Sequence, residues 1–142
     1  MVKLYIGLSG SDKTKEMLHD IAEALEQEHG SVVCIEKGGK LRYDVNYKVR
    51  LIEYSDYQLE GVASLKAFIS GLHAGNFDIT RVFLKSIHRL LGTDDPKVMA
   101  EFCDWCETFG LANGVSFTIT ARVDPALAPA EMKKYLSDRK RL

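Results

Sequence analysis

The residues whose types and spacing could do chemistry come early in the chain, between Gly7 and Thr14. They read Gly-Leu-Ser-Gly-Ser-Asp-Lys-Thr, after a short apolar run and before a long helical pattern. Backbone N–H groups of such a loop can point at an anion, a lysine can neutralise phosphoryl oxygens, and the hydroxyl after it can hold Mg²⁺. We therefore predict a phosphate site formed by Gly7, Ser9, Gly10, Ser11, Asp12, Lys13 and Thr14.

This spacing resembles the phosphate-binding loop of the P-loop NTPase superfamily, Gly-x-x-x-x-Gly-Lys-[Ser/Thr], with Asp12 in place of the second framework glycine. The resemblance covers the first strand–helix–strand unit. It implies ATP or GTP as the ligand, with Mg²⁺ held by Thr14. Because Asp12 places a negative charge beside the anion, we expect binding with weak or no hydrolysis. The alternative is that Asp12 or Ser11 caps the helix and that Lys13 is simply exposed.

Hydrolysis would also need a carboxylate at the end of a buried strand, to order the metal and the water. The apolar run 79–84 is followed by Lys85 instead, which counts against hydrolysis. Asp56 is the candidate metal ligand in its place, with Glu53 nearby, and either could also serve a small-molecule enzyme; ordinary loop charges are the alternative. In open α/β sheets the ligand crevice forms at the carboxyl ends of the strands. We therefore expect the charged and hydroxyl residues near these ends to form one cluster. Its members would be Lys13, Thr14, Glu53, Asp56, Lys85 and Asp124.

Apolar periodicity predicts five strands that alternate with helices. The strands are expected at 2–7, 31–35, 49–54, 79–84 and 115–121, and the helices at 12–28, 62–74, 86–91, 94–110 and from 129 to 136. This alternation indicates one α/β domain over residues 1–142, with three αβα layers and a mostly parallel five-stranded sheet. The resemblance implies that its topology is P-loop NTPase-like.

An aromatic-rich segment lies between the second and third strands. Its apolar residues alternate with polar ones, which predicts an exposed ribbon. Four tyrosines lie in or beside it: Tyr43, Tyr47, Tyr54 and Tyr57. Such rings suit a partner surface, so the alternative function is a non-catalytic interaction domain that has lost nucleotide binding and forms a homo-oligomer. These rings could equally cover the sheet of their own subunit.

The composition disfavours nucleic-acid binding and membrane insertion as functions. The 142 residues are 46% hydrophobic and 27% charged, as in a globular domain. A net charge of -1 disfavours nucleic acid as a partner. No apolar run is long enough to span a membrane, and the chain starts directly in a strand, so we expect a cytoplasmic protein.

The cysteines are Cys34, Cys103 and Cys106, an odd number without the spacing of a disulfide framework. Cys103 and Cys106 have a Cys-x-x-Cys spacing but lie in the middle of a predicted helix, where neither redox chemistry nor zinc is expected. We predict one of them in the core and the other near the surface. The four histidines belong to no ligand motif.

Overall fold

The structure, a computed structural model, describes the backbone of residues 1–141 and the side chains of residues 1–9 and 12–137. Over these residues the chain forms one sheet with the strand order β3-β2-β4-β5-β1-β6. All neighbouring strands are parallel. The strands are β1 (Val2–Gly7), β2 (Ser31–Glu36), β3 (Arg50–Glu53), β4 (Ile79–Leu84), β5 (Ser116–Arg122) and β6 (Leu136–Arg141).

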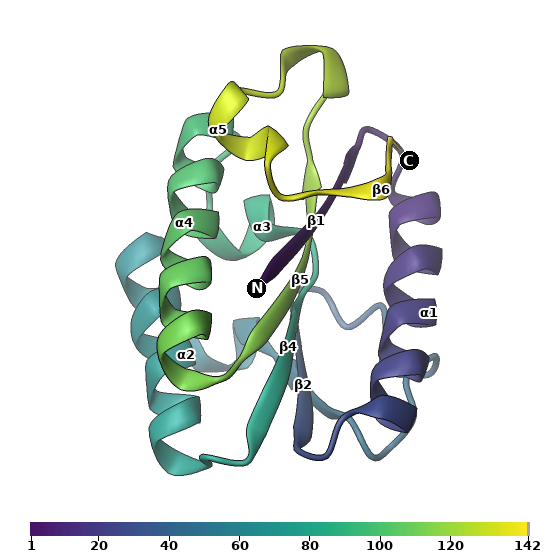
Figure 1. Cartoon of the computed structure of the whole chain (residues 1–142), viewed down its shortest axis with the longest axis vertical. Helices are drawn as coiled ribbons and strands as arrows, with labels where there is room; N and C mark the ends of the chain where they lie inside the picture. The colour runs from purple at the N-terminus through teal and green to yellow at the C-terminus, as the bar shows by residue number, and fades with distance from the viewer. Residues whose placement is uncertain (142) are drawn as a thin grey trace.

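Helices cover both faces of this sheet (Figure 1). On one face lies α1 (Gly10–Gln27), and on the other lie α2 (Val62–Gly75), α3 (Ile87–Leu91) and α4 (Pro96–Asn113), with the short α5 (Ala130–Lys133) beside α4. Two 3-10 turns, η1 (Tyr54–Tyr57) and η2 (Pro125–Leu127), follow β3 and β5. The predicted α/β class with three αβα layers is therefore confirmed.

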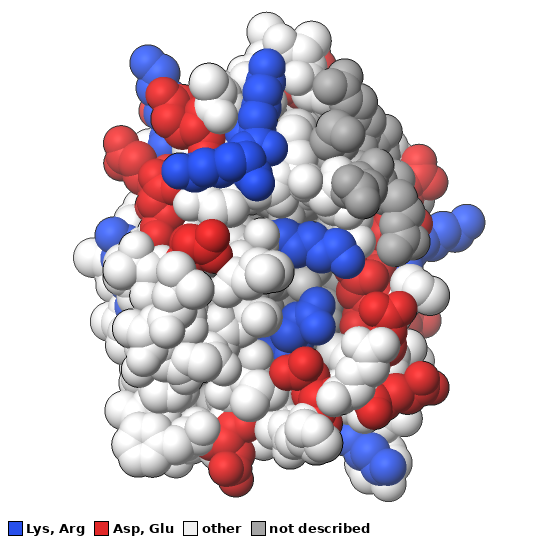
Figure 2. All heavy atoms as spheres, viewed as in Figure 1, with Lys and Arg blue, Asp and Glu red and all other residues white. Residues whose placement is uncertain are grey.

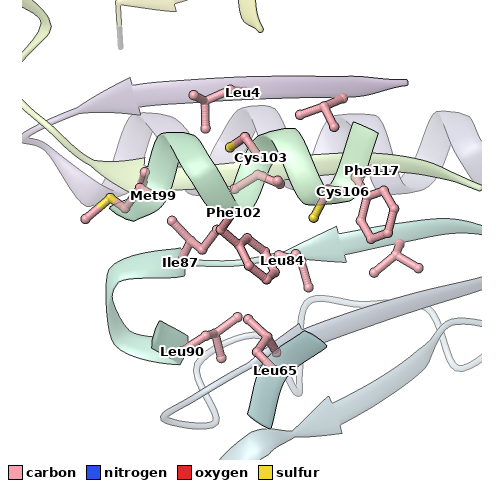
Figure 3. Packing of buried hydrophobic residues seen from close by; sticks show 14 of the residues in the cluster. Leu4, Leu65, Leu84, Ile87, Leu90, Met99, Phe102, Cys103, Cys106 and Phe117 are labelled. Carbon is pink, nitrogen blue, oxygen red and sulfur yellow. The ribbon is translucent and has the colours of Figure 1, made fainter. Parts of the chain in front are cut away.

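Alternation along the buried strands divides the core into two clusters. In β2, Val33 and Ile35 pack in the cluster under α2 and α4, whereas Val32 and Cys34 pack against α1, because successive strand side chains point to opposite faces. Figure 3 shows the larger cluster, in which Phe102, Cys103 and Cys106 of α4 face the sheet. Cys103 and Cys106 are both buried, so the prediction that one lies near the surface is wrong.

The C-terminal segment differs from the prediction. The expected helix from 129 to 136 is only the single turn α5, and the chain then forms β6 beside β1 as a sixth strand. The exposed edge of β1 accounts for this difference, because its N–H groups need partners. The N–H of Leu4 donates to the carbonyl of Tyr135 at 2.8 Å, and the buried Met132 and Tyr135 hold the turn on the sheet.

The aromatic-rich segment also differs from the prediction. Residues 40–49 form turns rather than a ribbon, and only Arg50–Glu53 joins the sheet. Leu41 and Val49 anchor the segment in the core. Tyr43 and Tyr47 are each 89% exposed, whereas Tyr54 is fully buried. None of the described helices is long and apolar enough to cross a membrane.

Candidate functional site

The predicted phosphate loop connects β1 to α1. Helix α1 begins at Gly10, and its N-cap residue is Ser9, whose side chain makes no capping hydrogen bond. Asp12 is exposed and lies inside the first turn. The alternative in which Asp12 or Ser11 caps the helix is therefore wrong. Gly10 and Ser11 supply backbone to this turn, and the Ser11 side chain lies outside the described residues.

Lys13 is buried under the loop, with only 5% of its surface exposed. Its ammonium Nζ donates to the carbonyls of Gly7 and Ser9, at 2.7 Å each. Lys13 is one turn before the fully buried Met17, so its stem lies on the face of α1 that contacts the sheet. The alternative that Lys13 is simply exposed is therefore wrong. The structure instead holds a positive charge directly beneath the loop.

Arg122, the last residue of β5, lies beside this loop. In the parallel pairing of β1 and β5, Arg122 is the register partner of Gly7. The chain leaves β1 toward α1 on one face of the sheet and leaves β5 toward α5 on the other face (Figure 1). Two adjacent strands whose connections diverge in this way form a topological switch point, where open α/β sheets place their ligand crevice. The exposed Arg122 thus ends its strand at this switch point.

The turn after β4 adds a second cation to the same edge. Lys85 is half-buried, and its backbone N–H donates to the carbonyl of Ile35 at 3.0 Å. Ser86 adopts a left-handed conformation with φ of 56°, and its N–H donates to Thr120 Oγ1 at 2.7 Å. A non-glycine residue in this region costs about 1–3 kcal/mol, and such strain is typical of functional sites.

His88 of α3 joins this turn to β5, because its Nδ1 accepts from the N–H of Arg122 at 3.4 Å. That bond leaves the second ring nitrogen to carry the proton of the neutral imidazole. Burial lowers the pKa of His88, and the nearby Arg89, Arg122 and Lys13 lower it further against the opposing effect of Asp94.

These cations influence one another electrostatically. Burial lowers the pKa of the Lys13 ammonium, and so do the charges of Arg122 and Lys85, with Asp12 acting in the opposite direction. Burial also lowers the pKa of Lys85. Among the described residues, no carboxylate forms an ion pair with Lys13, Lys85 or Arg122. Glu36 acts on Lys85 and Asp12 acts on Lys13 with the opposite sign, so these cations are compensated only in part and an anion at this edge would interact favourably with them.

The two residues predicted to hold a metal do not come together. Thr14 is half-buried in α1 above β1, whereas Asp56 is exposed in η1 after β3. Since β3 is four strand positions from β1 in the sheet, roughly 19 Å separates the two strands at about 4.8 Å per neighbour. Glu53 lies at the same distant edge. The part of the chain that the structure describes holds no group of three His, Cys, Asp or Glu side chains suited to a metal ion.

The expected cluster is thus only partly assembled. The switch point brings together Lys13 and Lys85, and Asp124 follows β5 as the cap of η2, where it accepts from the N–H of Ala126 at 3.0 Å. Sequence reasoning missed Arg122 and His88. Arg122 directly follows the strand predicted at 115–121 and could have been found by the rule that selected Asp124, whereas His88 has no sequence signal.

The fold and this site define the class of the protein: an α/β protein with an all-parallel sheet and with Lys13, Lys85 and Arg122 near the carboxyl ends of adjacent strands. No model of a known protein family matches the chain, and no curated protein is significantly similar to it. A functional assignment therefore depends on the geometry of this crevice.

Proposed function

We propose that the protein binds a nucleotide or another phosphate-bearing small molecule at the carboxyl edge of its sheet, with weak or no hydrolysis. The observation that carries this proposal is the position of Arg122, the register partner of Gly7, whose carbonyl accepts from the buried ammonium of Lys13. A guanidinium binds two phosphate oxygens at once, and the N-terminus of α1 adds a partial positive charge. The loop, the N-terminus of α1 and Arg122 thus all favour a phosphate-bearing ligand.

The residue after β4 supports the second part of the proposal. Phosphoryl transfer to water needs a carboxylate or an equivalent group that orients the water and the metal. Lys85 occupies this place, and the carboxylates Glu53 and Asp56 lie at the distant edge of the sheet. The ligand is therefore bound rather than rapidly hydrolysed.

A thermal-shift series tests the proposal. ATP, GTP and their diphosphates are titrated into the wild type, Arg122→Gln and the control Arg50→Gln. Arg50 is also an exposed arginine, but it begins β3 at the opposite edge of the sheet. A ligand that binds only the native state raises the melting temperature. We expect a rise for the wild type and Arg50→Gln and a much smaller one for Arg122→Gln; the absence of any rise in the wild type contradicts the proposal.

A second candidate function is the non-catalytic interaction domain. It is favoured by Tyr43 and Tyr47, whose rings are 89% exposed on the segment between β2 and β3. In addition, Figure 2 shows few charged side chains over the lower parts of α2 and α4. Phe77, which follows α2, and Leu111, in the last turn of α4, are exposed. Sedimentation over a range of concentrations tests this candidate. Self-association that Tyr43→Ser and Tyr47→Ser abolish would favour it, and a monomer at every concentration would contradict self-association.

A further inference from the structure

We infer that the crevice takes its phosphate ligand as the free anion, without a divalent metal, because Lys85 and Arg122 occupy the positions from which carboxylates would hold the metal. This inference depends on the proposed function. It assigns a ligand species, a di- or triphosphate chain that is not complexed with Mg²⁺, to the same site.

Two carboxylates at strand ends, Glu36 and Glu53, are already engaged by hydrogen bonds, whereas Asp12 beside the loop is exposed. Mg²⁺ in nucleotide sites is held by one or two carboxylates together with the phosphates. Glu36 at the end of β2 is buried, and its two carboxylate oxygens accept from the N–H groups of Lys40 at 3.2 Å and Leu41 at 2.8 Å. These bonds fix Glu36 as the anchor of the segment after β2.

Glu53 is engaged in the same way at the end of β3. One of its oxygens accepts from the N–H of Gly38 at 2.8 Å, and the other accepts from the N–H and the hydroxyl of Ser55. These bonds hold the pKa of Glu53 below its ordinary value against the opposing effect of burial. Glu53 therefore closes the turn beside Gly38 at the far side of the sheet.

Cationic side chains lie at or near the carboxyl ends of β4, β5 and β1. Lys85 follows β4, Arg122 ends β5, and Lys13 of α1 lies beneath the loop after β1; these three strands are consecutive in the sheet. Neighbouring strands are about 4.8 Å apart, so the three strand ends span roughly 10 Å, a width comparable to a short phosphate chain. Positive charges so close together repel a divalent cation and attract a polyanion. Because Mg²⁺ cancels two negative charges of its ligand, the complexed anion would gain less from this crevice than the free one.

Calorimetric titration tests the inference, with pyrophosphate and ATP as probes. Each probe is titrated in EDTA and in excess MgCl₂, with NaCl adjusted so that both buffers have the same ionic strength and screen the charges equally. We expect binding in EDTA and several-fold weaker binding in MgCl₂. Equal or tighter binding in MgCl₂ overturns the inference while leaving the proposed function intact. No binding in either buffer overturns the proposed function, and the inference with it.

Variants at Lys85 sharpen this test. We expect Lys85→Gln to weaken binding in EDTA about tenfold, the effect of losing one hydrogen bond to a charged group. Lys85→Asp places a carboxylate after β4, so its binding should become stronger with MgCl₂ than without it. The control Arg50→Gln should behave like the wild type. Unchanged affinity in Lys85→Gln, or a wild-type metal response in Lys85→Asp, overturns the inference; circular dichroism confirms that each variant is folded.

Discussion

The buried ammonium of Lys13 donates to the carbonyl of Gly7, six residues earlier, at 2.7 Å. A second bond of the same length, to the carbonyl of Ser9, makes Lys13 a bridge between the end of β1 and the start of α1. The Lys13 side chain therefore both fixes the shape of the loop and supplies the positive charge beneath it. In this protein the lysine is first a structural residue, and under the proposed function it would act on a ligand through the positive charge that it holds beneath the loop.

The first prediction concerns this bridge. Lys13→Met keeps the stem of the side chain but leaves the carbonyls of Gly7 and Ser9 without the ammonium. A buried polar group that loses its partner costs about 1–3 kcal/mol, and we expect the free energy of unfolding in urea to fall by about that amount. Lys15→Met, at an exposed position of the same helix, should change stability by less than about 0.5 kcal/mol. Equal stability of the two variants would show that the bridge does not hold the loop.

A second prediction compares two helical glycines. An alanine Cβ at Gly110 of α4 would lie 2.2 Å from the carbonyl oxygen of Val115, whereas one at Gly71 of α2 would meet no atom within 4 Å. We expect Gly110→Ala to lose about 1–3 kcal/mol of stability through overpacking and Gly71→Ala to gain about 0.5–1 kcal/mol through reduced chain entropy. Thermal and urea unfolding measure both. If Gly110→Ala were as stable as the wild type, the close contact between α4 and the start of β5 would be absent.

The third prediction concerns the thiols. Burial raises the pKa of Cys34 and of Cys103 to about 12, and burial also raises the pKa of Cys106 well above its ordinary value. Since the thiolate is the reactive form, a disulfide reagent near neutral pH should modify these cysteines only as fast as the protein unfolds. All three should react at once in guanidinium chloride. An exposed cysteine introduced by Ser70→Cys provides the reference rate, and a comparable rate for a native thiol would contradict the buried positions.

A fourth prediction follows from the lowered pKa of His88. Above about pH 6.5, the ordinary histidine pKa, His88 is neutral in both states and contributes no pH dependence. As the pH falls below that value, the unfolded chain takes up the proton first, so the free energy of unfolding declines until the pH reaches the folded pKa. Urea unfolding over this range should show a steeper decline for the wild type than for His88→Gln.

The control for His88 is the exposed His29, whose replacement by glutamine should leave this decline in place. A bound phosphate should also raise the pKa of His88, because it offsets the charges of Arg122 and Lys13. NMR titration of the imidazole measures this directly. A pKa that does not respond to a bound phosphate would place the ligand away from His88.

Local periodicity was sufficient to predict most of the fold. The strands 2–7 and 79–84 are observed with the same bounds, and the helix predicted at 12–28 is observed as Gly10–Gln27. These elements bury regular apolar positions, which is the signal that a sequence carries. In contrast, β6 reads Leu-Ser-Asp-Arg-Lys-Arg and has no such signal. It is a strand because the edge of β1 offers it hydrogen bonds.

The sequence predicted only the part of the site that lies within one continuous segment. The loop at residues 7–14 follows from spacing within one segment, but the neighbours of that loop depend on strand order. The pairing of β1 with β5 places Arg122 beside Gly7 and leaves Asp56 at the opposite end of the sheet. No pattern along the chain contains this information, since Gly7 and Arg122 are 115 positions apart in the sequence.

The most direct test of the cationic crevice is an amide NMR titration of the labelled protein with pyrophosphate in EDTA. Binding at the switch point predicts that the largest shift changes fall on residues 7–14, 85–89 and 120–124, and that Arg122→Gln strongly reduces them at equal ligand concentration. Shift changes that fall instead on residues 40–50, or no changes at any concentration, would contradict a phosphate site at this edge of the sheet.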